Sequence, residues 1–137
     1  MIRSCRLFHI LFLLNTIIVF AQSSSINFST ENGLSTNTIY SSIQDSNGYL
    51  WFGTNHGVSR FNGFTFENFT IDDGLTDNEV FKLFQDSKKR IWFLTHSGVL
   101  CYFYKGKFFN PQNSPFLANQ KFSSFFTNII ELANGDL

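Results

Sequence analysis

The sequence predicts an all-β fold made of short antiparallel strands, and three observations lead to that prediction. Asn-Gly or His-Gly pairs at 47–48, 56–57 and 62–63 separate short apolar or aromatic runs, and such pairs supply the positive φ angles that two-residue hairpins need. The same pattern returns 41 residues downstream. The 19 Phe residues and an aromatic content of 18% suit strands, whose pleated faces accept aromatic and β-branched side chains.

The repeat predicts the architecture more narrowly. Its paired landmarks are Gly33 and Gly74, Asn37 and Asn78, Gln44 and Gln85, Trp51 and Trp92, and Gly57 and Gly98. After Val99 the register slips, and a third copy has begun by residues 129–137, which parallel 42–50 at an offset of 87. A unit of about 40 residues with four strands and a Trp at a fixed place is typical of a β-propeller blade. The sequence therefore predicts two complete four-stranded antiparallel blades and the start of a third, which together form an incomplete propeller.

The N-terminus has the layout of a secretory signal peptide. Two arginines precede an apolar run over 7–20, whose 14 residues are fewer than the ~17–25 that a membrane-spanning helix needs. Small residues precede a cleavage point after Ala21, so we expect residues 1–21 to be removed. The mature chain is therefore predicted to be periplasmic or secreted. A Ser-rich mobile segment is expected over 22–32, with ordered structure starting near Leu34.

The predicted blades follow in order. Blade 1 is expected over about 33–73, blade 2 over about 74–115 and the start of blade 3 over about 116–137. The strands expected in the two complete blades are Thr38–Gln44, Tyr49–Thr54, Val58–Phe61 and Phe64–Phe69, then Glu79–Gln85, Ile91–Thr95, Val99–Tyr104 and Lys107–Phe109. Neighbouring blades cover each other's sheets, so Trp51 and Trp92 are expected in the core between blades.

Charge and cysteine content exclude several classes of function. Removal of the signal peptide leaves eight basic and ten acidic residues, a net charge of about −2, which gives no electrostatic footprint for nucleic acid. Cys101 is the single cysteine of the mature chain, so no internal disulfide forms there, and we expect it to be an unreactive strand residue. No motif for a nucleophile, a metal cluster or a cofactor is present.

Three motifs of the first unit resemble the two-component regulator propeller repeat. They are Gly-Leu-Ser-x-Asn-x-Ile at 33–39, Gln-Asp-Ser-x-Gly-x-Leu-Trp-Phe-Gly-Thr-x-x-Gly-Val at 44–58, and Arg-Phe-Asn-Gly at 60–63. The resemblance covers roughly residues 31–137. The second unit departs from it at Lys88-Lys89-Arg90, at Leu94 and at Cys101-Tyr102-Phe103-Tyr104.

The resemblance implies a function. Such repeats usually form the extracytoplasmic sensor of bacterial hybrid two-component regulators, so it implies a periplasmic propeller that senses polysaccharide-derived ligands. It implies contact with a membrane only through C-terminal parts that would follow. Because the residues supply no nucleophile, metal cluster or paired carboxylates, we expect no enzyme. Two alternatives stay open: a fragment of a secreted propeller enzyme that acts on carbohydrates, and a non-functional gene remnant. With fewer than three blades, the chain is expected to need further blades or self-association.

Candidate ligand-binding residues come from the topology of a blade. Alternating hairpins put the link before the first strand and the loop after the second strand on one side, so Asn37, Asn55, His56 and Asn78 are expected to share a rim. Their amide and imidazole groups suit an oligosaccharide ligand. The loop of the second unit adds Thr95 and His96. Asp45 and Asp86 recur in the first hairpin of each unit, where we expect them to cap turns.

Overall fold

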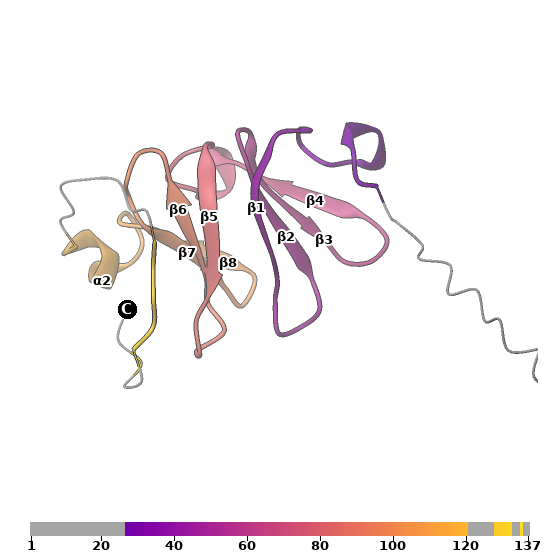
Figure 1. Cartoon of the computed structure of the whole chain (residues 1–137). Helices are drawn as coiled ribbons and strands as arrows, with labels where there is room; N and C mark the ends of the chain where they lie inside the picture. Colours follow the sequence, from indigo (N-terminus) through magenta and orange to yellow (C-terminus); the bar gives the residue numbers. More distant parts are fainter. Residues whose placement is uncertain (1–26, 121–127, 133–134, 136–137) are drawn as a thin grey trace, which may run out of the picture.

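The computed structural model describes residues 27–120, 128–132 and 135, and it contains two four-stranded antiparallel sheets (Figure 1). The first sheet consists of β1 (Ile39–Gln44), β2 (Leu50–Thr54), β3 (Gly57–Phe61) and β4 (Phe66–Phe69). The second sheet consists of β5 (Val80–Gln85), β6 (Ile91–Thr95), β7 (Cys101–Tyr104) and β8 (Lys107–Phe109). The strands of each sheet follow chain order, and the first strands, β1 and β5, lie side by side. The predicted all-β class, with propeller blades that do not close into a ring, is confirmed; the signal peptide predicted over 1–21 lies outside the described residues.

Short helices form the links and the segment after the second sheet. The elements are η1 (Thr30–Asn32), η2 (Ile71–Asp73) and α2 (Pro115–Ala118). η1 and η2 occupy equivalent positions in the chain, each before the first strand of its sheet. Gly33 ends η1 with a φ angle of 102°, and Gly74 ends η2 with a φ angle of 112°. None of the helices in the described part of the chain combines the length and the hydropathy of a membrane-spanning helix.

Strand β4 is shorter than the sequence predicts. It begins at Phe66 instead of Phe64. The side-chain oxygen of Asn62 accepts the backbone N–H groups of Phe64 and Thr65, at 2.9 Å each. This local turn takes the donors that a longer strand would use.

Strand β7 also starts late. It begins at Cys101 instead of Val99, because the Val99 carbonyl accepts a hydrogen bond from the Thr76 hydroxyl at 2.6 Å. The sheet registers show one extra residue before this strand: Phe93 pairs with Cys101, whereas its counterpart in the first sheet pairs with Ser59. Cys101 is fully buried, and burial raises the pKa of its thiol, which agrees with the predicted unreactive role.

An aspartate ties the first hairpin of each sheet to its Trp. One carboxylate oxygen of Asp45 accepts two backbone N–H groups of the turn, at 2.8 and 3.0 Å, and the other accepts the indole N–H of Trp51 at 2.9 Å. Asp86 accepts the indole N–H of Trp92 at 2.8 Å. The predicted turn-capping role is confirmed, and the same side chains satisfy the only polar atom of each buried indole.

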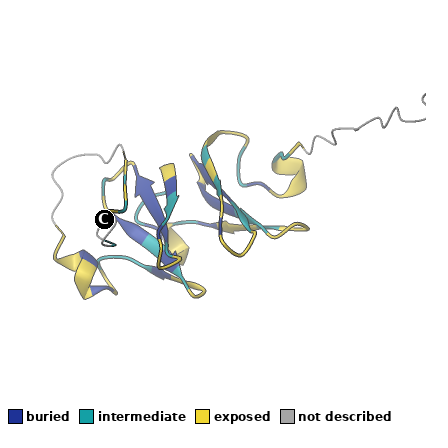
Figure 2. Ribbon diagram, turned by 60° about the horizontal axis from the view of Figure 1, so that its bottom comes forward, coloured by how far each residue is buried: buried dark blue, intermediate teal, exposed yellow. Residues whose placement is uncertain are grey.

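The two sheets pack face to face through an aromatic core (Figure 2). Trp51 is 1% exposed, and its ring centroid lies 5.2 Å from that of Phe103 in the second sheet. The other buried members of this core are Val58, Phe69, Leu75, Val80, Leu83, Ile91, Phe93, Cys101 and Phe108. Trp92 is equally buried, in a second cluster with Leu100 and Leu117. The predicted core role of both Trp residues is confirmed.

Gly53 is required by this packing. A Cβ atom at Gly53 would lie 2.7 Å from the carbonyl oxygen of Val80 in the neighbouring sheet, which is closer than atoms tolerate. The second sheet has Leu94 at the corresponding place, and Leu94 is 1% exposed. The glycine therefore belongs to the interface between the two sheets.

Each sheet contains a contact between an arginine and an aromatic ring, and the two residue types stand at swapped positions in the two sheets. In the first sheet the guanidinium of Arg60 lies 4.9 Å from the ring centroid of Tyr49. In the second sheet Arg90 occupies the Tyr49 position and Tyr102 occupies the Arg60 position, at 5.3 Å. Such a contact contributes about 0.5–1 kcal/mol at exposed sites. Two of the departures seen in the second repeat thus compensate for each other.

The residues just before the first sheet repeat the end of β4. Phe28 corresponds to Phe69, 41 residues later. Phe28 packs on Phe52, Phe61 and Phe66, with ring centroids 5.7, 4.8 and 5.3 Å away. The sequence predicted a mobile segment over 22–32 and order from Leu34. In the structure the last part of that segment is held to the first sheet by this ring and by η1.

The third copy also repeats local contacts. Ser46 of the first sheet donates its backbone N–H to the side chain of Gln85 at 2.9 Å, and Ser87 of the second sheet donates in the same way to Glu131 at 2.8 Å. Gln85 and Glu131 are equivalent repeat positions. The Gly135 N–H donates to the Leu132 carbonyl, as in the first hairpin. The described residues of 128–132 form no strand.

Candidate functional site

One edge of the two sheets gathers the links and the middle turns. We call this edge the upper rim; it consists of links 29–38 and 70–79 and turns 54–57 and 95–98. The first hairpins of both sheets lie at the opposite edge, as Figure 1 shows. The rim therefore contains every residue that the sequence proposed for ligand binding.

Asn37 and Asn78 hold the links in place. The side-chain oxygen of Asn37 accepts the backbone N–H of Thr30 at 3.0 Å. Asn78 accepts the backbone N–H of Ile71 at the same distance. Both bonds fix the short helix in front of a sheet, so these oxygens are engaged in the scaffold, and the repeat of the two asparagines follows from this shared structural task.

Asn55 and His56 lie in the turn between β2 and β3, and both are exposed. The turn is held by the backbone N–H of His56, which donates to the Thr54 hydroxyl at 2.9 Å. The next residue, Gly57, donates its N–H to the Asn78 carbonyl at 2.6 Å. The structure thus brings Asn55, His56 and Asn78 to one part of the upper rim, whereas Asn37 belongs to the link before the first sheet.

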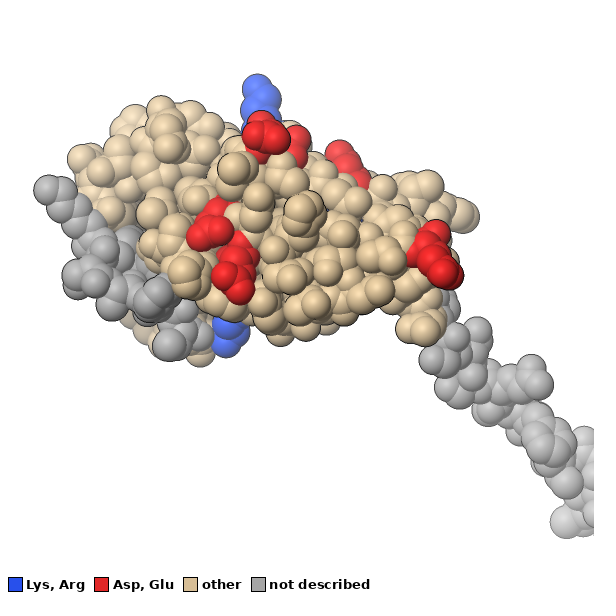
Figure 3. Space-filling model, turned by 90° about the horizontal axis from the view of Figure 1, so that it is seen from above, with Lys and Arg blue, Asp and Glu red and all other residues tan. Residues whose placement is uncertain are grey.

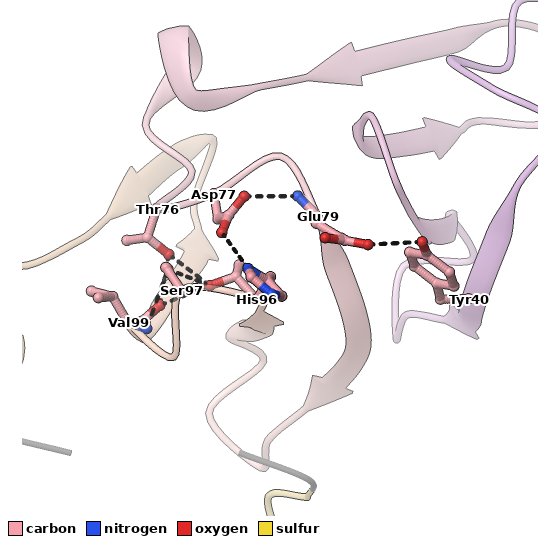
Figure 4. A network of polar contacts seen from close by, with 8 residues as sticks. Tyr40, Thr76, Asp77, Glu79, His96, Ser97 and Val99 are labelled. Carbon is pink, nitrogen blue, oxygen red and sulfur yellow. Dashed lines mark hydrogen bonds and ion pairs between the residues drawn. The ribbon is translucent and has the colours of Figure 1, made fainter. Parts of the chain in front are cut away.

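A polar network joins the second link to the next turn (Figure 4). His96 Nδ1 lies 3.9 Å from Asp77 Oδ2, and its backbone N–H donates to the Glu79 carbonyl at 2.8 Å. The Glu79 side chain accepts the Tyr40 hydroxyl at 2.9 Å, and this hydrogen bond is the main cause of the raised pKa of Tyr40. The network therefore connects the two sheets across the rim.

Three residues of this network (Figure 4), Tyr40, Asp77 and Glu79, were not predicted from the sequence. Tyr40 and Phe81 occupy the same repeat position, and both fall near the start of a first strand, next to the rim. An aromatic residue at one position in both repeats was the available signal. Asp77 and Glu79 gave none, because the equivalent residues of the first repeat are Thr36 and Thr38.

Hydroxyl groups close each middle turn on its link. Ser35 and Thr54 lie 3.3 Å apart in the first sheet, and Thr76 and Thr95 lie 3.3 Å apart in the second. Thr54 and Thr95 are buried. These side chains are structural, which leaves the exposed side chains of the rim for binding.

The rim is acidic. Its links contain Glu31, Asp72, Asp73, Asp77 and Glu79, and its four segments contain no Lys or Arg. In Figure 3, seen from above, acidic side chains are spread over this face and basic side chains lie at its margins. Within residues 27–120, 128–132 and 135, no three His, Cys, Asp or Glu side chains gather as a metal site requires. The arrangement offers hydrogen-bond acceptors to a ligand.

A comparison with models of protein families shows which repeat the two units are similar to. The model of the family described as two component regulator propeller matches residues 33–56 and 74–97. These two segments of the chain are therefore similar to the two-component regulator propeller repeat. Each match runs from a link through the first two strands to the middle turn, so both matches include part of each rim segment. The family is a regulatory repeat and not a family of enzymes. No curated protein matches the chain.

Proposed function

We propose that this region is the periplasmic ligand-sensing part of a hybrid two-component regulator, and that it binds a polysaccharide-derived ligand without altering it. The match of both repeats to the regulator family carries the proposal. The upper rim supports it, because Asn55 and His56 are exposed there and their side chains suit sugar hydroxyls.

Export is the first condition of this proposal. A propeller that samples polysaccharide fragments outside the cytoplasm must be secreted, and residues 1–21 have the layout of a cleaved signal. Intact-mass measurement of protein from the periplasmic fraction is expected to give a chain that begins at Gln22. A mass that includes the apolar run over 7–20 would contradict export by cleavage.

Ligand binding is the second condition. Isothermal titration of the full chain with a panel of oligosaccharides is expected to find at least one that binds and is recovered uncleaved. Replacing Asn55 and His56 together with Ala should weaken that binding by about tenfold, since each lost hydrogen bond costs about 0.5–1.5 kcal/mol. A matched control, Asn47→Ala, changes an exposed asparagine at the opposite edge. Cleavage of the sugar would favour the enzyme alternative instead.

A further inference from the structure

The first strand of each sheet contains a β-bulge at the same place. In the first sheet Ile39 pairs with Thr54 and Ser41 with Gly53, which leaves Tyr40 as the extra residue. The second sheet has the same irregularity between Val80 and Lys82, with Phe81 as the extra residue. A bulge turns a side chain away from the regular alternation of a strand, and bulges are over-represented at sheet edges and next to active sites.

The two bulges bring two exposed aromatic rings together. Tyr40 is 42% exposed and Phe81 is 38% exposed. Their ring centroids lie 5.1 Å apart with an interplanar angle of 53°, and the imidazole of His96 lies 6.0 Å from the Phe81 ring. Equivalent positions of two sheets thus contribute to one aromatic surface beside the upper rim.

A carboxylate is held beside this aromatic pair. The Tyr40 hydroxyl donates to Glu79, which fixes the ring and the carboxylate relative to each other (Figure 4). An ionised carboxylate offers about four acceptor sites, so Glu79 retains capacity for further donors. The rim segments next to the pair contribute acids and no Lys or Arg.

We propose that Tyr40 and Phe81 form the stacking surface for a sugar ring of an uncharged oligosaccharide, with Glu79 accepting hydrogen bonds from its hydroxyl groups. This inference rests on the proposed function and specifies its ligand. One face of a pyranose ring presents C–H groups, which the electron-rich face of an aromatic ring attracts, and its edge presents hydroxyl donors. Acidic sugars are disfavoured, because Asp77 and Glu79 repel a second carboxylate at this place.

The test compares wild-type full chain with Tyr40→Leu, Phe81→Leu and the double variant by isothermal titration. Leucine keeps apolar bulk at these exposed positions but lacks an aromatic face. Thermal melts of Phe81→Leu should match wild type, and those of Tyr40→Leu should match Tyr40→Phe, which also lacks the hydroxyl that donates to Glu79. Each substitution is expected to weaken binding of a neutral oligosaccharide by about 5–10-fold. Tyr40→Phe retains the ring and should lose less. Phe64→Leu is the control, because Phe64 is 91% exposed in the turn between β3 and β4.

The outcomes separate this inference from the proposed function. If a neutral sugar binds and the double variant binds it equally well, the stacking surface is wrong while carbohydrate sensing stands. If oligosaccharides with uronic acid residues bind more tightly than neutral ones, the assigned ligand class is wrong. If no sugar of the panel binds wild-type protein, the proposed function fails, and this inference fails with it.

Discussion

At the residue scale, Asp86 shows how one carboxylate anchors a sheet. Its side chain is fully buried, and it accepts hydrogen bonds from the Trp92 indole and from the Arg90 guanidinium, at 2.8 and 2.5 Å. Burial by itself disfavours the charged form. The hydrogen bonds from Trp92 and Arg90, together with the charge of Arg90, outweigh burial and lower the pKa of Asp86.

This shift has a consequence for pH dependence. Because the folded-state pKa of Asp86 is below its unfolded value, the group adds stability above the unfolded pKa, and that stability is lost as pH falls through the folded pKa. Thermal melts from pH 7 downward should therefore fall less steeply below about pH 4 for Asp86→Asn than for wild type. The control is Asp72→Asn, which changes an exposed acid of η2. Parallel curves for wild type and Asp86→Asn would contradict this account.

The site residues were only partly predictable from sequence. Blade topology placed Asn55 and His56 on the rim, because hairpin alternation follows from turn positions alone. It could not show that the side chains of Asn37 and Asn78 hold the backbone of Thr30 and Ile71, since those bonds depend on the folded path of the links. The two asparagines recur because each holds the backbone of its link, and their recurrence does not indicate ligand binding.

At the element scale, the first hairpin of the second sheet contains a strained residue. Lys89 has a φ angle of 64°, in the left-handed region, at the position that Gly48 occupies in the first sheet with a φ angle of 89°. A residue with a Cβ costs about 1–2 kcal/mol in this conformation, whereas glycine adopts it freely. The turn is therefore less favourable in the second sheet.

Lys89→Gly should stabilise the protein by roughly 0.5–1 kcal/mol, because relief of the strain exceeds the added entropy of the unfolded chain. The reciprocal change, Gly48→Ala, should destabilise it by a similar amount, since no atom lies near enough to clash and the effect is conformational. Urea denaturation of both variants measures the two differences. A neutral or negative effect of Lys89→Gly would show that the lysine side chain contributes to this turn.

All eight strands in the described part of the chain were predictable to within two residues because turn residues mark their ends. Ile91–Thr95 and Lys107–Phe109 match the structure in full. The deviations come from side chains that compete for backbone groups, such as Asn62 before β4. The exchange of Arg60 and Tyr102 was visible in the sequence as a departure, but its compensation by Arg90 requires the strand register.

At the scale of the whole molecule, the contact between the two sheets is directional. The first sheet contributes the face with Trp51, and the second contributes the face with Phe93, Phe103 and Phe108. The corresponding face of the first sheet carries Phe52, Phe61 and Phe66, and among the described residues the ring that covers them is that of Phe28. When unlike faces meet, each added sheet leaves one face uncovered. The same contact therefore repeats until the sheets close into a ring or the copies form an open chain.

A polypeptide of residues 22–137 is therefore expected to self-associate, because a propeller typically needs ~4–8 blades to cover such faces. Its sedimentation coefficient should rise with concentration. Phe66→Glu places a charge on the phenylalanine face and should shift the population toward monomer, whereas Phe64→Glu, two residues away but 91% exposed, should not. A monodisperse monomer with a sharp cooperative melt would show that two sheets and Phe28 suffice, and that this face requires no further blade.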